Sequence, residues 1–298
     1  WGGGVSIFNP AMVESITLSN GVFSAKYGRG SSGFLEATTI KADFENYHGN
    51  FNLSTTCADA FVQIPFGKNT GGMIFGTHLS FLEPFVWAYK KSGGSEMDFL
   101  KRAPYIRDFF LKANFTPVPE LDVAVTGFFG SDGLEIDQSD TTDGITTRSV
   151  MDYDYYQILG GINVKYLLSD RVFFHGTVSY NNMIEDMKIM MSENGTVKYS
   201  DDFVDKYGAL YSNVDYGKSY SLNNINSKNN ENIKNHLVTA RLDGEFEITE
   251  KNHFTLGIEE LFSTADTEEN FGGWTDIEAG GERYFKNVKA FTRSNGNC

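Results

Sequence analysis

Three glycines, Gly28, Gly30 and Gly33, have the G-x-G-x-x-G spacing of a turn that binds the pyrophosphate of a dinucleotide. That chemistry needs a strand before the turn and a helix that begins inside it, because the helix N-terminus binds the phosphates. The residues that follow, FLEATTI, include β-branched residues and no apolar stripe of period 3.6, so they predict a strand. We therefore interpret the glycines as a tight turn between strands.

The other residues that could carry chemistry are scattered along the chain. No two histidines have the H-x-x-x-H spacing of a metal pair, and no G-x-S-x-G nucleophile turn occurs. The histidines are His48, His78, His175, His236 and His253, and the two cysteines are Cys57 and Cys298. This pattern favours a protein that is not an enzyme and that holds no cofactor and no metal ion.

An acidic segment spans residues 131–144 and contains no basic residue. Its carboxylates could supply oxygen ligands to calcium, but they lack the spacing of an EF-hand loop. A solvated acidic loop is the favoured interpretation, and calcium binding is left open. The carboxylates are Asp132, Glu135, Asp137, Asp140 and Asp143.

Composition restricts the class of protein further. The 298 residues carry a net charge of −14, which argues against a nucleic-acid partner because such a partner requires a basic surface. The chain has 25 Phe and 15 Tyr but only 6 Pro, a bias that favours strands and that also supplies the aromatic belts of membrane proteins. No apolar run approaches the ~18 residues of a transmembrane helix.

Apolar and polar residues alternate with period two in four pairs of segments, each pair joined by a short turn. Long polar stretches separate the pairs: about 83–102, 131–154, 183–235, and 264 to the end. Alternating short turns and long loops are typical of an up-and-down antiparallel barrel in an outer membrane. The pairs are Gly49–Phe66 with Met73–Leu82, Ala103–Thr116 with Leu121–Gly130, Tyr155–Leu168 with Arg171–Asn182, and His236–Thr249 with His253–Ser263.

The segment RLDGEFEIT shows how the faces of such strands divide. A soluble β-sandwich could alternate in the same way, but its strands usually run ~5–6 residues, whereas a tilted membrane strand needs ~9–11. We expect an apolar set to face lipid: Phe109, Leu111, Ala113, Phe115, Leu242, Phe246 and Ile248. We expect a charged set to face the lumen: Arg241, Asp243, Glu245 and Glu247.

The run from Ser6 to Thr39 resembles the end of the plug domain of TonB-dependent outer-membrane receptors. In that family an FNP-type turn leads to an apolar segment, a turn glycine, a YGRG-type turn and a strand that ends in small residues and threonine. Here these are Phe8-Asn9-Pro10, Val13 to Leu18, Gly21, Tyr27-Gly28-Arg29-Gly30 and Ala37-Thr38-Thr39. The residues that follow, GNFNLSTTCADAFVQIPF and its return strand, look like the first barrel strands of the family.

The resemblance implies an all-β, transmembrane, antiparallel up-and-down β-barrel that is partial, with about eight strands of a larger barrel. Residues 1–42 would be the C-terminal part of the plug domain, and residues 43–298 would be the N-terminal part of the barrel. The implied function is active uptake of a scarce nutrient (a siderophore, vitamin, saccharide or peptide) across a bacterial outer membrane. The partners would be lipid, the nutrient, and a TonB-type inner-membrane protein that binds through a segment missing from this chain.

By the same resemblance, ligands bind between the outward apex of the plug and the extracellular loops. The residues proposed to contribute are Trp1, Gly2, Gly3, Gly4, Trp87, Tyr89 and Tyr211, since aromatic rings stack on sugars or siderophores. The chain departs from the family in lacking the partner-binding motif, most of the plug and an aromatic terminal strand, so the resemblance implies a fragment. The alternative is a small self-contained outer-membrane barrel that acts as a structural anchor or adhesin.

Overall fold

The computed structural model describes residues 12–20, 33–142, 144–198, 219–249, 252–279 and 282–297. These residues form two separate antiparallel sheets and one short helix. The smaller sheet pairs β1 (Val13–Asn20) with β2 (Gly33–Thr39), and Leu18 lies opposite Leu35. The glycine spacing therefore leads into a strand, as predicted, although Gly28 and Gly30 lie outside the described residues.

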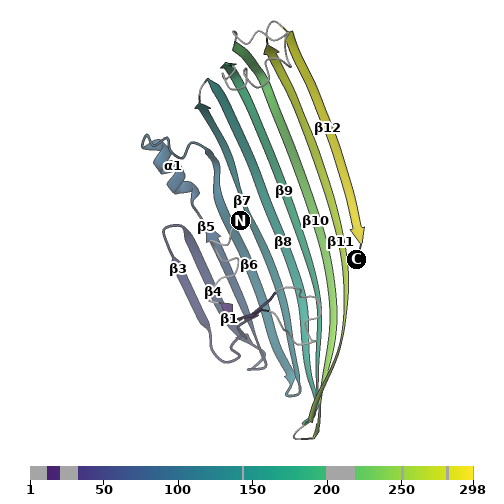
Figure 1. The fold of residues 1–298 in the computed structure, drawn as a ribbon. Coiled ribbons are helices and arrows are strands. Elements are labelled where there is room, and N and C mark those ends of the chain that lie inside the picture. Colours follow the sequence, from purple (N-terminus) through teal and green to yellow (C-terminus); the bar gives the residue numbers. More distant parts are fainter. Residues whose placement is uncertain are drawn as a thin grey trace.

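The larger sheet contains ten strands, each paired only with its neighbours in the sequence (Figure 1). Its order from β3 to β12 is the chain order, which is the up-and-down arrangement of the sequence prediction. Within the described residues β3 and β12 each pair on one side only, so the sheet is an open arc of barrel wall. The strands are β3 (His48–Leu53), β4 (Cys57–Phe66), β5 (Gly71–Ser80), β6 (Leu100–Val118), β7 (Leu121–Thr142), β8 (Ile145–Ser169), β9 (Val172–Lys198), β10 (Ser219–Thr249), β11 (Asn252–Ala279) and β12 (Glu282–Asn297).

The prediction of eight strands in this sheet was too low at both ends. The segment Gly49–Phe66, interpreted as one strand, contains β3 and β4, which pair with each other around a turn at Ser54. The polar stretch after residue 264 continues β11 and adds β12. Asn is depleted in strands in general, but backbone pairing does not depend on the side chain. β11 is paired on both sides, and β12 is paired with β11 from Glu282 to Asn297.

The predicted long loops are in large part strand. Residues 131–142 belong to β7 and residues 145–154 to β8, so the acidic segment is an extended hairpin arm instead of a loop. Successive carboxylates in a strand point to opposite faces, and Asp137 is paired with Arg148 of β8 at 2.8 Å. The stretch 183–235, predicted to be irregular, forms the paired ends of β9 and β10 wherever it is described.

The register assigns every paired residue to one of two faces, because directly opposed residues of neighbouring strands share a face. One row consists of Ala113, Val125, Ile162, Val178 and Ala240, and the adjacent row on the other face consists of Asn114, Ala124, Asn163, Thr177 and Arg241. We call the face of Asn114 the inner face and the face of Ala113 the outer face. The seven residues expected to face lipid lie on the outer face by this register.

The outer face carries an apolar band. On β8 it extends from Ile158 to Leu168, and these two side chains are 52% and 57% exposed. Ten steps of ~3.3 Å along a strand tilted by ~40° give a height of about 25 Å, which equals the apolar band of an outer-membrane barrel. Val238 to Ile248 on β10 gives the same height. Glu260, opposite Ala240, interrupts the band on β11.

The helix α1 (Glu83–Lys91) lies between β5 and β6, where a long polar loop was predicted. Pro84 follows its first residue, Glu83 lies in its first turn, and Lys90 and Lys91 lie in its last turn, a distribution of charge that complements the helix dipole. In the part of the chain that the structure describes, no helix combines the length and the apolar character needed to cross a membrane.

Candidate functional site on the inner face

The segment at the end of β2, where the chain leaves the small sheet, is bound to the inner face of β6. The ammonium group of Lys112 donates three hydrogen bonds to this segment, to the carbonyl of Thr39 at 3.1 Å, to its hydroxyl at 2.8 Å and to the carbonyl of Ile40 at 2.9 Å. The backbone N–H of Ile40 in turn donates to the carbonyl of Met12 at 3.0 Å. One cation therefore holds the end of β2 against the large sheet.

The next residues of the segment are held by side-chain amides. Asn114, 4% exposed, accepts a hydrogen bond from the backbone N–H of Ala42 at 3.2 Å, and Gln63 accepts one from Asp43 at 2.7 Å. The ammonium group of Lys41 pairs with the carboxylate of Asp122 at 2.5 Å. These contacts satisfy backbone groups that have no strand partner, so residues 39–43 are seated on the inner face without joining the sheet as a strand.

Two glycines of β5 permit this close approach. A Cβ atom on Gly72 would lie 2.5 Å from the carbonyl oxygen of Asp43, and a Cβ on Gly76 would overlap the sulfur atom of Met12. Met12 and Ala42 are 4% and 5% exposed as a result. We call these contacts of residues 12 and 39–43 with β4, β5, β6 and β7 the seat.

Asp43 also closes a turn at the edge of the seat. Its carboxylate accepts hydrogen bonds from the backbone N–H groups of Glu45 at 2.7 Å and Asn46 at 3.1 Å, and it lies 2.7 Å from Nε2 of His48. Hydrogen bonds to the carboxylate hold the pKa of Asp43 well below its ordinary value. The bond from the Glu45 N–H has the largest effect, and those from His48 and Asn46 have smaller ones. The turn is therefore stabilised by the ionised carboxylate.

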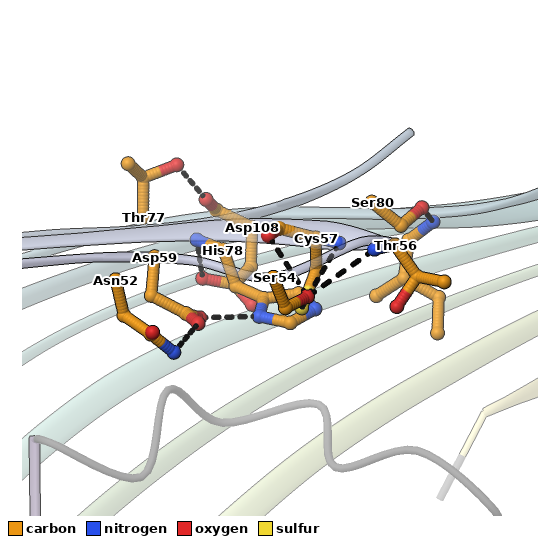
Figure 2. A network of polar contacts seen from close by, with 10 residues as sticks. Asn52, Ser54, Thr56, Cys57, Asp59, Thr77, His78, Ser80 and Asp108 are labelled. Carbon is orange, nitrogen blue, oxygen red and sulfur yellow. Dashed lines mark hydrogen bonds and ion pairs between the residues drawn. The ribbon is translucent and has the colours of Figure 1, made fainter. Parts of the chain in front are cut away.

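A row of polar side chains crosses four strands beside the seat (Figure 2). Asn52 of β3 donates to the carboxylate of Asp59 at 3.3 Å, and the other oxygen of Asp59 lies 2.5 Å from Nδ1 of His78. The backbone N–H of His78 donates to one carboxylate oxygen of Asp108 at 3.1 Å. Asp108 is 3% exposed, and its second oxygen has no hydrogen-bond partner in the part of the chain that the structure describes.

Cys57 adjoins this row and is a free cysteine. Its sulfur lies 3.0 Å from the hydroxyl oxygen of Ser54, which also accepts a hydrogen bond from the Cys57 N–H at 3.0 Å. Figure 2 shows the imidazole of His78 between the carboxylate of Asp59 and the Ser54–Cys57 pair. The ligand atoms of Cys57, Asp59 and His78 all lie within 4.8 Å of one another.

The four charged residues predicted to face the lumen lie on β10. Arg241 pairs with Asp243 at 2.7 Å and with Glu259 of β11 at 3.5 Å, and Asp243 is 7% exposed. The register puts Arg241 and Asp243 on the inner face, together with Asn114 and Asp122 of the seat, and Glu245 and Glu247 follow at alternate positions. That this face lines a lumen stays a prediction.

The residues proposed from the resemblance to bind ligand are not gathered into one described site. Trp87 and Tyr89 lie on α1, where Trp87 is 63% exposed beside Lys91 and Tyr89 donates to Glu96 at 3.1 Å. Residues 1–4 and Tyr211 lie outside the described residues. Their proposed role in ligand binding stays a prediction.

Sequence reasoning did not find the seat or the polar row. Lys112 and Asn114 occupy the polar positions of an alternating strand, and that pattern predicts their face but not their binding role. His78 was judged isolated by its spacing, whereas pairing of β4 with β5 puts it directly opposite Asp59. Two features of the sequence could have indicated the site: polar residues in the otherwise apolar segment CADAFVQIPF, and two glycines, Gly72 and Gly76, in the strand that pairs with it.

Comparisons with known proteins add little to this geometry. No protein-family model matches the sequence, and no curated protein matches it. Solved structures that it resembles include the alcaligin outer membrane receptor FauA from Bordetella pertussis, at 10% identity and a TM-score of 0.33 over 97% of this chain, and the ferric citrate transporter FecA, at 8% and 0.27 over 82%. CarO from Acinetobacter baumannii matches at 14% and 0.19 over 66% of this chain and 80% of its own. The chain spans 47% of FauA and 38% of FecA, and likenesses this weak carry no argument about function.

Proposed function

We propose that this chain is part of a TonB-dependent outer-membrane receptor that takes up a scarce nutrient. Residues 1–42 form the C-terminal part of its plug, and residues 43–298 form the first part of its barrel wall. The proposal rests on the order of motifs from Ser6 to Thr39 and on the geometry of the seat.

The observation that carries the proposal is the position of the N-terminal segment. Its β1–β2 pair forms a sheet of its own, and its continuation is bound to the polar face of a wall whose opposite face carries an apolar band. The backbone of a soluble arm would be hydrogen-bonded to water and would not need partners on that face. An additional barrel strand would pair at the edge of the sheet. A plug inside a barrel would be bound to the inner face in this way, which supports the proposal.

The open arc favours the receptor over the small self-contained barrel. Within the described residues β3 and β12 do not pair with each other, so these ten strands do not close around their own side chains. Unpaired edges are costly in lipid, where backbone groups find no water. We infer that further strands complete the wall and that the polar inner face, with Arg241 and Asp243, lines the lumen around the plug.

The test is uptake by the bacterium that carries the gene, compared with a strain that lacks it. The probes are a labelled ferric siderophore, cobalamin, a maltooligosaccharide and an oligopeptide, each measured with and without an uncoupler of the inner membrane. We expect the gene to be required for uptake of one class, and the uncoupler to abolish that uptake. Equal uptake of all four classes by both strains would contradict the transporter and would leave the anchor or adhesin.

A labelling experiment tests the topology separately. In a Cys57→Ser, Cys298→Ser background, Thr141→Cys places a thiol at the far end of β7, and Asp170→Cys places one in the short turn before β9. A membrane-impermeant maleimide should label position 141 on intact cells and position 170 only after the outer membrane is opened. The reverse pattern would invert the proposed orientation.

A further inference from the structure

We propose that Cys57, Asp59 and His78 form a binding site for a divalent transition-metal ion of the zinc type, on the inner face beside the seat. The three side chains come from two strands that pair directly, β4 and β5, and their ligand atoms lie within 4.8 Å of one another. The proposal is independent of transport, since it concerns only the chemistry of these strands.

The charge around His78 favours a cation. Asp59 and Asp108 lie on either side of it in one row, and among the described residues the only ion pair of Asp59 is with His78, while none is found for Asp108. Asp108 is 3% exposed and keeps one carboxylate oxygen without a donor. A buried carboxylate of this kind is costly unless a positive charge or a further donor lies near it.

The donor set selects the kind of ion. A thiolate and an imidazole suit zinc and its neighbours in the first transition row, whereas calcium and magnesium require oxygen ligands. Zinc bonds of ~2.0–2.3 Å in a tetrahedron separate ligand atoms by roughly 3.3–3.8 Å. Rotation of the side chains would have to bring the three ligand atoms, which lie within 4.8 Å of one another, to that spacing.

The surrounding hydrogen bonds are those that orient metal ligands. Asp59 contacts Nδ1 of His78 at 2.5 Å, so a bound ion would take the place of the proton between this carboxylate oxygen and Nδ1, and both residues would be ligands. Asn52 in turn donates to Asp59, and the hydroxyl of Ser54 contacts the sulfur of Cys57. Bound metal would thus link β4 to β5 and stabilise the hairpin on which Met12 and Ala42 pack.

The experiment uses the full chain purified in detergent, stripped with a chelator and titrated with Zn²⁺ and with Co²⁺. We expect one zinc ion per chain in calorimetry, and with cobalt the near-ultraviolet charge-transfer absorption of a thiolate ligand. Cys57→Ser should abolish that absorption, and Asn52→Ala, which removes the donor to the ligand Asp59, should weaken zinc binding by about 10–100-fold, as loss of an outer-shell partner does.

Matched controls are available within the chain. Cys298→Ser removes the other thiol, and His48→Gln removes a histidine that pairs with Asp43 outside the site, and neither should change the titration. Far-ultraviolet circular dichroism and the heat-dependent mobility of each variant in gels verify that it has folded. The proposal is overturned if the wild-type chain binds no zinc, if bound cobalt lacks the thiolate absorption, or if that absorption depends on Cys298 instead of Cys57.

Discussion

The strongest test of the seat is the substitution Lys112→Met, which removes the charge and keeps an unbranched side chain that is one atom shorter. Three hydrogen bonds from one ammonium group are lost. A hydrogen bond that involves a charged group contributes about 1.5–3 kcal/mol, and the three acceptors regain part of this from water, so we take about 3 kcal/mol for the set. Since ~1.4 kcal/mol is tenfold, the fraction of molecules with residues 39–43 released should rise on the order of 100-fold.

Hydrogen exchange measured by mass spectrometry reports the fraction of molecules in which residues 39–43 are released. The amides of Ile40, Ala42 and Asp43 are protected by bonds to Met12, Asn114 and Gln63, so each should exchange about 100-fold faster in the variant.

Lys165→Met is the matched control, because Lys165 is an exposed lysine on the same face, opposite Asp122. It should leave these rates unchanged. If Lys112→Met changes them less than threefold, or if Lys165→Met changes them equally, the account of the seat is wrong.

Three further predictions concern the faces, the close approach and the turn. Val178→Lys, in the apolar band of the outer face, should destabilise the folded protein in lipid vesicles by about 2–4 kcal/mol in urea titrations, whereas its inner-face neighbour Ser179→Lys should cost far less; equal costs would refute the assignment of faces. Gly76→Val should expel the side chain of Met12 and speed hydrogen exchange at the seat. The backbone pairing of β5 should be kept, because Val is a good strand former. Unchanged exchange would show that Met12 is not held there. Because the pKa of Asp43 is lowered, its ionised form stabilises the turn fully above pH ~4, the ordinary pKa of an aspartate, and this contribution is lost as the pH falls from there toward the lowered pKa. Hydrogen exchange of the turn amides, compared with that of Asp43→Asn over the same pH range, checks this. Identical pH profiles would contradict it.

The alternation of side chains predicted most of the wall. Where a strand has one apolar and one polar face, as around Leu242, period two sets both the strand and its orientation. The apolar positions from Phe109 to Phe115 were assigned correctly to one face for the same reason. The up-and-down order followed from short turns such as Ser169-Asp170, which can only join antiparallel neighbours.

The parts beyond the apolar band were not predictable in this way. There apolar and polar residues do not alternate: the end of β10 is mostly polar, as in SKNNENIKN, and the end of β9 has an apolar run, IMM, so both were interpreted as loops. Their structure comes from pairing, since Asn229 lies opposite Ile189 on one side and Phe271 on the other. The seat and the polar row depend on contacts between residues far apart in the sequence, such as Lys112 with Thr39, which no local pattern contains.

The composition of the seat has a consequence for assembly. All of its described partners lie on β4 to β7, the early part of the wall, and each of these strands pairs with its immediate neighbour in the sequence. Pairing of sequence neighbours requires closure of only short loops, so these strands can form before the rest of the wall exists. We therefore expect the N-terminal segment to be bound while the sheet is still open, and the later strands to wrap around a segment already in place, so that nothing has to be threaded into a closed pore.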